Sequence, residues 1–107
     1  MPLINIEYDD NKVDESKARV LSEAVQKIVS EATGIKDVFV YANTAKVRVE
    51  IAPIEIFVRM SDTKIEDLEA LTTKIKDKIS EWKKETDFKA SINLTVIPMH
   101  WKIEIGI

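Results

Sequence analysis

The sequence has no cysteine, a single histidine and only two glycines among its 107 residues. Without cysteine, the chain forms no disulfide, carries no thiol nucleophile and offers no thiolate to a metal. His100 alone is insufficient for a histidine-rich metal cluster. Two glycines are too few for a glycine-rich phosphate loop or a dinucleotide-binding fingerprint. We therefore expect neither a metal site nor a cofactor.

Long apolar runs and an excess of positive charge are also missing. No run of about 18 apolar residues occurs, so we expect no membrane partner. No basic and apolar leader opens the chain, which favours a cytoplasmic location. Sixteen lysines and arginines against nineteen acidic residues give a formal net charge of −3. Because the nucleic-acid backbone requires a basic protein face, we expect no nucleic-acid partner either.

Hydrophobic periodicity indicates one α+β domain, 1–107, built of two similar halves of about 1–50 and 51–107. In the first half it predicts a strand at Leu3–Tyr8, a helix from Asp14 to about Thr33, and strands at Val38–Ala42 and Lys46–Ala52. In the second half it predicts a strand at Ile54–Met60, a helix from Thr63 to about Lys84, and short strands at Ile92–Val96 and Trp101–Ile105, the last two separated by Pro98.

Residues with special capping properties mark the ends of both predicted helices. Asp14 is a suitable N-cap, and Gly34 stands where a left-handed residue ends a helix. Thr63 and Glu66 have the spacing of a capping box. Between the halves, Pro53 moves the apolar residues from odd to even positions, which indicates a bend or a change of strand partner.

The two halves match at a constant offset of 50 residues, for example Ile6 with Ile56 and Leu21 with Leu71. This favours duplicated β-α-β units with both helices on one face of a mixed sheet. The helix residues expected to be buried are Leu21, Val25, Ile28, Leu68, Leu71, Ile75 and Ile79. The other sheet face carries polar residues together with Phe57 and Ile97, so it either meets water or forms a subunit interface.

The chain begins Met1-Pro2 at the start of a predicted strand, and its first helix ends Ala32-Thr33-Gly34. With the duplicated strand–helix–strand pattern and the short strand after Pro98, these features resemble the tautomerase superfamily. That family includes oxalocrotonate tautomerase and macrophage migration inhibitory factor (MIF). The resemblance covers essentially the full chain. It implies a tautomerase/MIF-like fold and a homotrimer whose sheets surround a central barrel.

The resemblance also implies an activity, that of an isomerase. In the family, an amino-terminal proline acts as a base and moves a proton between carbon and oxygen of a keto–enol substrate, in a pocket between subunits. In this sequence the proline is Pro2, freed by removal of Met1. The implied substrate is a small 2-oxo or unsaturated acid, so the expected partner is a small-molecule carboxylate.

Physical chemistry supports Pro2 independently. A free α-amino group ordinarily has a pKa near about 8, and apolar surroundings or a nearby cation lower the pKa of an amine. Leu3, Phe39 and Met60 are candidates for the apolar walls. Arg59 lies at the end of the strand expected to run antiparallel to the first, so it is the candidate cation. Its guanidinium also suits a substrate carboxylate. The simpler alternative is that Pro2 only starts a strand.

Other family residues match less closely. A lysine directly follows the Ala-Thr-Gly helix ending in MIF, whereas here Ile35 has that place and Lys36 comes one residue later. An arginine of the following strand in oxalocrotonate tautomerase corresponds to Phe39. The candidate catalytic residue is therefore Pro2, and the candidate substrate-binding residues are Arg59, Lys36 and Phe39.

Two other functional classes remain open at this stage. One is a non-catalytic homotrimer of the same fold. The other is a ferredoxin-like module for small-molecule binding or protein interaction, whose strand and helix order is nearly the same. The apolar segment from Trp101 to Ile105 favours an oligomer, because an exposed apolar edge must be covered. Glu7 facing Glu55, and the lone His100, are interpreted as surface residues.

Overall fold

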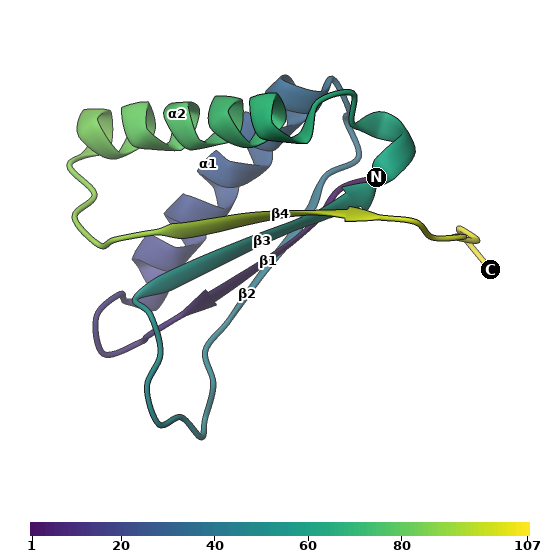
Figure 1. Ribbon diagram of the computed structural model, residues 1–107. Coiled ribbons are helices and arrows are strands. Elements are labelled where there is room, and N and C mark those ends of the chain that lie inside the picture. The colour runs from purple at the N-terminus through teal and green to yellow at the C-terminus, as the bar shows by residue number, and fades with distance from the viewer.

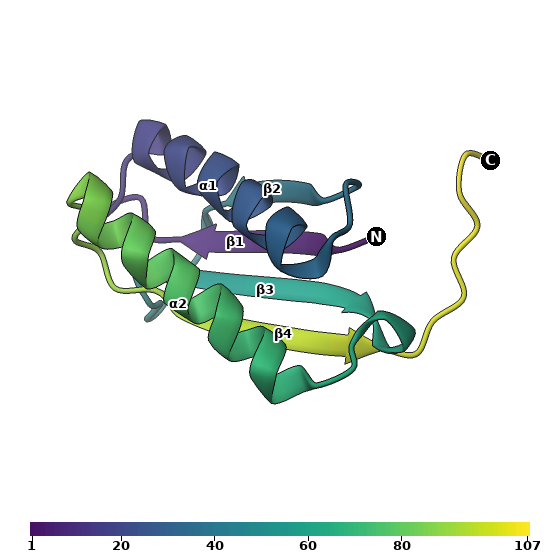
Figure 2. The same ribbon diagram turned by 90° about the horizontal axis from the view of Figure 1, so that it is seen from above.

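The computed structural model describes residues 1–107 and contains four strands and two long helices. The elements are β1 Leu3–Tyr8, α1 Glu15–Thr33, β2 Phe39–Asn43, β3 Ile54–Ser61, the short 3₁₀ helix η1 Asp62–Lys64, α2 Leu68–Thr86 and β4 Asn93–Met99. The strands form one sheet in the order β2-β1-β3-β4. Figures 1 and 2 show α1 and α2 side by side on the same face of this sheet.

The sheet is mixed, as the sequence predicted. β1 is parallel to β2 and antiparallel to β3, and β3 is parallel to β4. Each half of the chain therefore forms a β-α-β unit, and the two units join along the antiparallel β1–β3 pair. The predicted α+β arrangement, with two helices on one face of a mixed sheet, is confirmed.

The hydrophobic core lies between the helices and the two central strands. Alternate residues of β1 and β3 point toward the helices and are buried, as the period of two requires. The helices bury one stripe each. The fully buried side chains of this layer include Ile4, Ile6, Leu21, Val25, Val29, Ile54, Ile56, Val58 and Ile75. Neither helix carries an apolar stretch of the length needed to cross a bilayer.

The ends of α1 follow the predicted caps. The carboxylate of Asp14 accepts hydrogen bonds from the Lys17 amide at 2.8 Å and the Ser16 hydroxyl at 2.7 Å. Gly34 ends the helix in the left-handed region at φ 71°, and its amide donates to the carbonyl of Ser30. A residue with a β-carbon is strained in this conformation, so glycine suits the position.

The predicted capping box at Thr63 and Glu66 is wrong. The hydroxyl of Thr63 lies 2.8 Å from that of Ser61, and Thr63 is part of η1 instead of a helix N-cap. α2 begins at Leu68, after Asp67, whose carboxylate accepts from the Ala70 amide at 3.0 Å. Leu68 is consequently 40% exposed at the first position of the helix, not buried as expected. Ile28 and Leu71 are only partly buried.

The segment at Lys46–Ala52 is not a strand, although its residues alternate. Both edges of β1 are already occupied by β2 and β3, and the segment pairs with neither free edge of the sheet, the outer edges of β2 and β4. Val47 and Val49 are fully exposed. Arg48 holds the segment to the turn after β1, with its guanidinium 3.4 Å from Asp9 and 2.5 Å from Asp10.

The last part of the sequence also differs from expectation. β4 continues through Pro98, which did not interrupt it, because an edge strand tolerates a residue without an amide hydrogen. The strand predicted at Trp101–Ile105 is absent. Residues 100–107 lie beyond the sheet, extend away from it and contact no strand partner within the chain (Figure 2). The apolar side chains of this tail, including Ile105, are left exposed.

Candidate functional site

Pro2 lies directly before β1, at the end of the sheet where α1 finishes and β2 begins. Its side chain is fully buried. The carbonyl of Pro2 accepts a hydrogen bond from the Phe39 amide at 3.1 Å, so β2 fixes the backbone of the proline. Met1 is partly buried beside it. While Met1 is attached, the Pro2 nitrogen is an amide and has no basic lone pair.

Two of the predicted site residues flank the same position of β1. Leu3 pairs with Phe39 of β2 on one side and with Arg59 of β3 on the other. The structure therefore brings Pro2, Phe39 and Arg59 to one end of the sheet. Strand alternation places the Pro2 ring on the helix side, whereas Leu3 and Arg59 belong to the open face.

Strand register places Arg59 opposite Leu3, the residue that follows Pro2. No carboxylate of the chain pairs with its guanidinium; the contact it makes is with the Phe57 ring, whose centroid lies 5.7 Å away. A guanidinium over an aromatic face is held in place by the ring quadrupole and still presents its donors outward. Arg59 is therefore able to bind a carboxylate from outside the chain.

Lys36 lies in the connection from α1 to β2 and is exposed. This connection is fixed at two points, since Ser30 donates to the carbonyl of Ile35 at 2.8 Å and Gln26 donates to that of Val38 at 2.9 Å. Lys36 is thus at the same end of the sheet as Pro2, but no contact joins the two side chains.

The predicted site residues do not line a principal cavity of the chain. Five cavities are lined by residues other than Pro2, Lys36, Phe39 and Arg59. Phe39 is instead 53% exposed on the open face of the sheet. The structure thus gathers three of the predicted groups at one end of the sheet without enclosing them in one of these cavities.

The open face carries one unpaired polar atom. The side-chain oxygen of Asn5 is buried and has no hydrogen-bond partner within the chain. Buried polar atoms are almost always paired, so this oxygen is available as an acceptor. Tyr41, on the neighbouring strand opposite Asn5, is half exposed. Glu7 and Glu55 do face each other across β1 and β3, and Asn93 donates to Glu55 at 2.9 Å.

Two clusters were not predicted from the sequence. One is the ion pair of Arg48 with Asp9 and Asp10, which the alternation of the surrounding segment concealed. The other is a cavity beside Trp82 and Phe88, because the helical periodicity around Trp82 predicts burial and not a cavity wall. His100 lies 3.5 Å from Asp62 and is almost fully exposed, as expected of a surface residue.

No protein-family model and no curated protein sequence matches the chain. Solved structures do match it. Malonate semialdehyde decarboxylase superposes with a TM-score of 0.69 at 10% identity, over 98% of this chain and 92% of that one. A macrophage migration inhibitory factor-like protein from Entamoeba histolytica superposes with a TM-score of 0.59 at 18% identity, over 96% and 93% of the two chains. A fused wild-type 4-OT in an asymmetric trimer gives 0.61 at 13%, over 91% and 85%.

At these identities the likeness concerns the fold, and it extends over nearly the whole chain in each case. The resemblance based on the paired β-α-β halves and on Pro2 before the first strand indicated the same fold. The chain has the fold of the tautomerase superfamily.

Proposed function

We propose that the protein is a tautomerase that uses Pro2, after removal of Met1, as the general base for keto–enol proton transfer. The substrate is a small 2-oxo or unsaturated acid. The observation that carries the proposal is the placement of Arg59, a cation without a carboxylate partner, opposite Leu3 and next to the buried proline.

The chemistry is a balanced proton transfer. The neutral secondary amine of Pro2 accepts the hydroxyl proton of the enol, and the O–H electron pair forms the C=O bond. The π electrons of the C=C bond then take a proton from the Pro2 ammonium at the carbon next to the carbonyl carbon, so no oxidant or reductant is needed. Arg59 binds the substrate carboxylate through its forked guanidinium. The positive charge of Arg59 also favours the neutral amine, which is the form that acts as a base.

We further propose that the pocket is completed by other copies of the chain in a homotrimer. Three observations support this: the half-exposed aromatic residues of the open face, the unpaired oxygen of Asn5, and the apolar tail after β4. The matching 4-OT structure is an asymmetric trimer. In the proposed assembly, the tail of one subunit pairs with a strand of its neighbour and covers Phe39.

Comparison of the protein with and without Met1 tests the mechanism. Intact mass identifies each form, and phenylenolpyruvate ketonisation, followed by absorbance, measures activity. The trimmed form should be active, whereas the Met1-retaining form should be inactive because its Pro2 nitrogen is an amide. Pro2→Ala in the trimmed protein keeps a free amine but makes it primary, so its rate should fall by up to about 10² to 10⁴. Equal activity with Met1 retained excludes the mechanism.

The second candidate is a non-catalytic homotrimer of the same fold. It is favoured by the complete burial of the Pro2 side chain. Inactivity of the trimmed protein toward several 2-oxo acids, together with an intact trimer, would select this alternative.

A further inference from the structure

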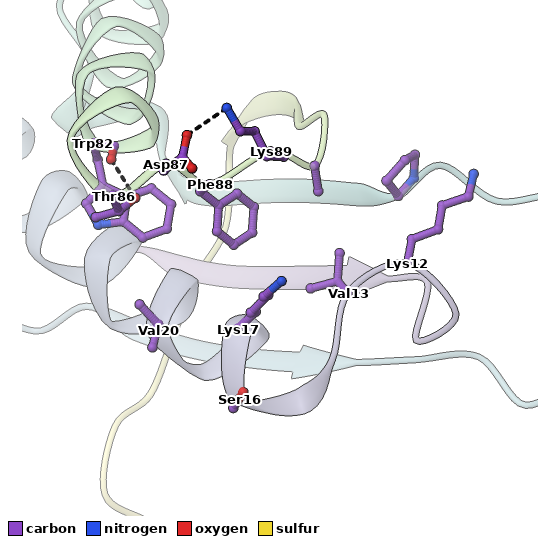
Figure 3. Close-up of a pocket in the computed structure, with 12 residues that line it drawn as sticks. Lys12, Val13, Ser16, Lys17, Val20, Trp82, Thr86, Asp87, Phe88 and Lys89 are labelled. Carbon is purple, nitrogen blue, oxygen red and sulfur yellow. Dashed lines mark hydrogen bonds and ion pairs between the residues drawn. The ribbon is translucent and has the colours of Figure 1, made fainter.

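A cavity of about 490 Å³ lies at the end of the sheet opposite Pro2. It is formed by the first turn of α1, the last turn of α2 and the residue before β3, Pro53. β1 separates it from Pro2 by roughly 20 Å, at about 3.3 Å per strand residue. Figure 3 shows Trp82 at one end of the cavity and Lys12 at the other, with Phe88 and Lys17 between them. We call it the Trp82 cavity.

Two aromatic rings form one wall of the Trp82 cavity. The ring centroids of Trp82 and Phe88 are 5.1 Å apart, with an angle of 43° between the planes. Asp87 adopts the left-handed conformation at φ 56°, and the Phe88 amide donates to the carbonyl of Lys83 at 3.0 Å. The chain thus reverses at the end of α2 and brings Phe88 back against the indole. Val13, fully buried, completes the apolar lining.

The charged groups of the cavity are mainly basic. Lys12, Lys17 and Lys89 line it, and Asp87 is the single acidic residue among the lining side chains. Asp87 pairs with Lys89 at 2.6 Å, whereas neither Lys12 nor Lys17 forms an ion pair. The lining therefore has a net charge of about +2 at neutral pH, counting three lysines and one aspartate.

We propose that the Trp82 cavity binds a small aromatic carboxylate, with its ring against Trp82 and Phe88 and its carboxylate toward Lys17 and Lys12. The volume is within the range of about 300 to 1,000 Å³ that is typical of small-molecule sites. The aromatic wall selects a flat apolar body, since offset or tilted rings attract one another. The two unpaired ammonium groups select an anion. This site is separate from the proposed function, because it shares no residue with the Pro2 end.

The experiment titrates 2-naphthoate into the full-length protein. Backbone amide shifts locate the site, and Trp82 fluorescence in a Trp101→Phe background gives the affinity. We expect saturable shifts at Val13, Lys17 and Phe88, with quenching of Trp82. The uncharged 2-naphthylmethanol should bind more weakly, and added salt should weaken binding of 2-naphthoate but not of the alcohol.

Matched variants test the electrostatic part of the recognition. Lys17→Gln should weaken 2-naphthoate binding by about two- to fivefold, as for an exposed ion pair, whereas Lys64→Gln in η1 should have no effect. Val20 lines the cavity and is 52% exposed, so it tolerates a polar side chain. Val20→Glu should reduce binding more than Val20→Gln, because the two differ only in charge.

Three results would overturn the proposal: no saturation at millimolar 2-naphthoate, equal affinity for the acid and the alcohol, or shifts confined to the Pro2 end. Pro2→Ala should leave the titration unchanged. Loss of tautomerase activity and loss of carboxylate binding at the Trp82 cavity are therefore distinguishable outcomes.

Discussion

The amide of Phe39 donates a hydrogen bond of 3.1 Å to the carbonyl of Pro2. This bond starts the β1–β2 ladder at the proline itself, one residue before the first assigned residue of β1. The sheet therefore fixes the carbonyl side of Pro2. If Met1 is removed as proposed, the freed nitrogen belongs to a residue whose carbonyl is already bound to β2.

Arg59 is expected to act on substrate binding more than on the fold. Arg59→Ala should raise the KM for a 2-oxo acid by roughly tenfold or more, because a charge-assisted hydrogen bond is lost. Arg59→Lys keeps the charge but not the forked geometry, so its KM should fall between the two. Steady-state kinetics and the urea unfolding midpoint measure both properties. Wild-type KM in Arg59→Ala would contradict the assigned role.

Deletion of residues 100–107 should reduce the size of the assembly. The tail exposes apolar side chains and has no partner within the chain, so we expect it to contribute to the subunit interface. Light scattering should give about three times 12.2 kDa for the full chain and a smaller species or aggregates after deletion. The double variant Ile103→Ser, Ile105→Ser keeps the length of the tail but removes two apolar side chains. It should therefore also reduce the size of the assembly. A monomeric full-length chain at micromolar concentration would contradict the trimer.

Core and terminal positions of α2 should respond differently to loss of an aliphatic side chain. Ile75 is fully buried, so Ile75→Ala should cost about 2 to 5 kcal/mol of unfolding free energy. Leu68 is 40% exposed, and Leu68→Ala should cost about 1 kcal/mol or less. Urea denaturation measures both values. Similar costs for the two variants would show that α2 begins earlier than Leu68.

The contribution of the α1 N-cap, Asp14, to folding stability should depend on pH. The Ser16 hydroxyl and then the Lys17 amide bond the Asp14 carboxylate, which lowers its pKa below the ordinary value of 3.8. Because its pKa is lower in the folded state, the ionised Asp14 carboxylate stabilises the fold above pH 3.8. This stabilisation is lost as the pH falls through the folded-state pKa. The stability difference between wild type and Asp14→Ala should therefore be largest at neutral pH and shrink below pH 3.8. A difference that grows in acid would contradict this assignment.

Much of the fold was predictable because the central strands and helices carry strong periodic signals. The limits of β1 and α1, the cap at Asp14 and the left-handed Gly34 all follow from local chemistry, and the structure contains them. The segment around Val47 and Val49 was mispredicted because alternation reports only local pattern. A strand also needs a pairing partner, and alternation does not show that the segment leaves the free outer edge of β2 unpaired.

The candidate site was predictable only in part. Register along β3 placed Arg59 beside the start of β1, since antiparallel pairing follows from the alternation of the two strands. The Trp82 cavity was not predictable, because it depends on the left-handed turn at Asp87, a residue whose sequence neighbours give no such signal. The 53% exposure of Phe39 was equally hidden, since the alternation of its strand does not show that this sheet face stays uncovered within the chain.

The pairing of Ile6 with Ile56 has a geometric consequence. These residues are equivalent in the two halves, fifty positions apart, and they also face each other in the antiparallel register. An approximate two-fold axis therefore passes between them and exchanges the two ends of the sheet. Under this rotation the start of β1 corresponds to the start of β3: Pro2 matches Ala52, and Leu3 matches Pro53, which lies at the Trp82 cavity. The first residues of β1 and β3 thus lie at opposite ends of the sheet. Substitutions at one of these strand starts need not affect the other.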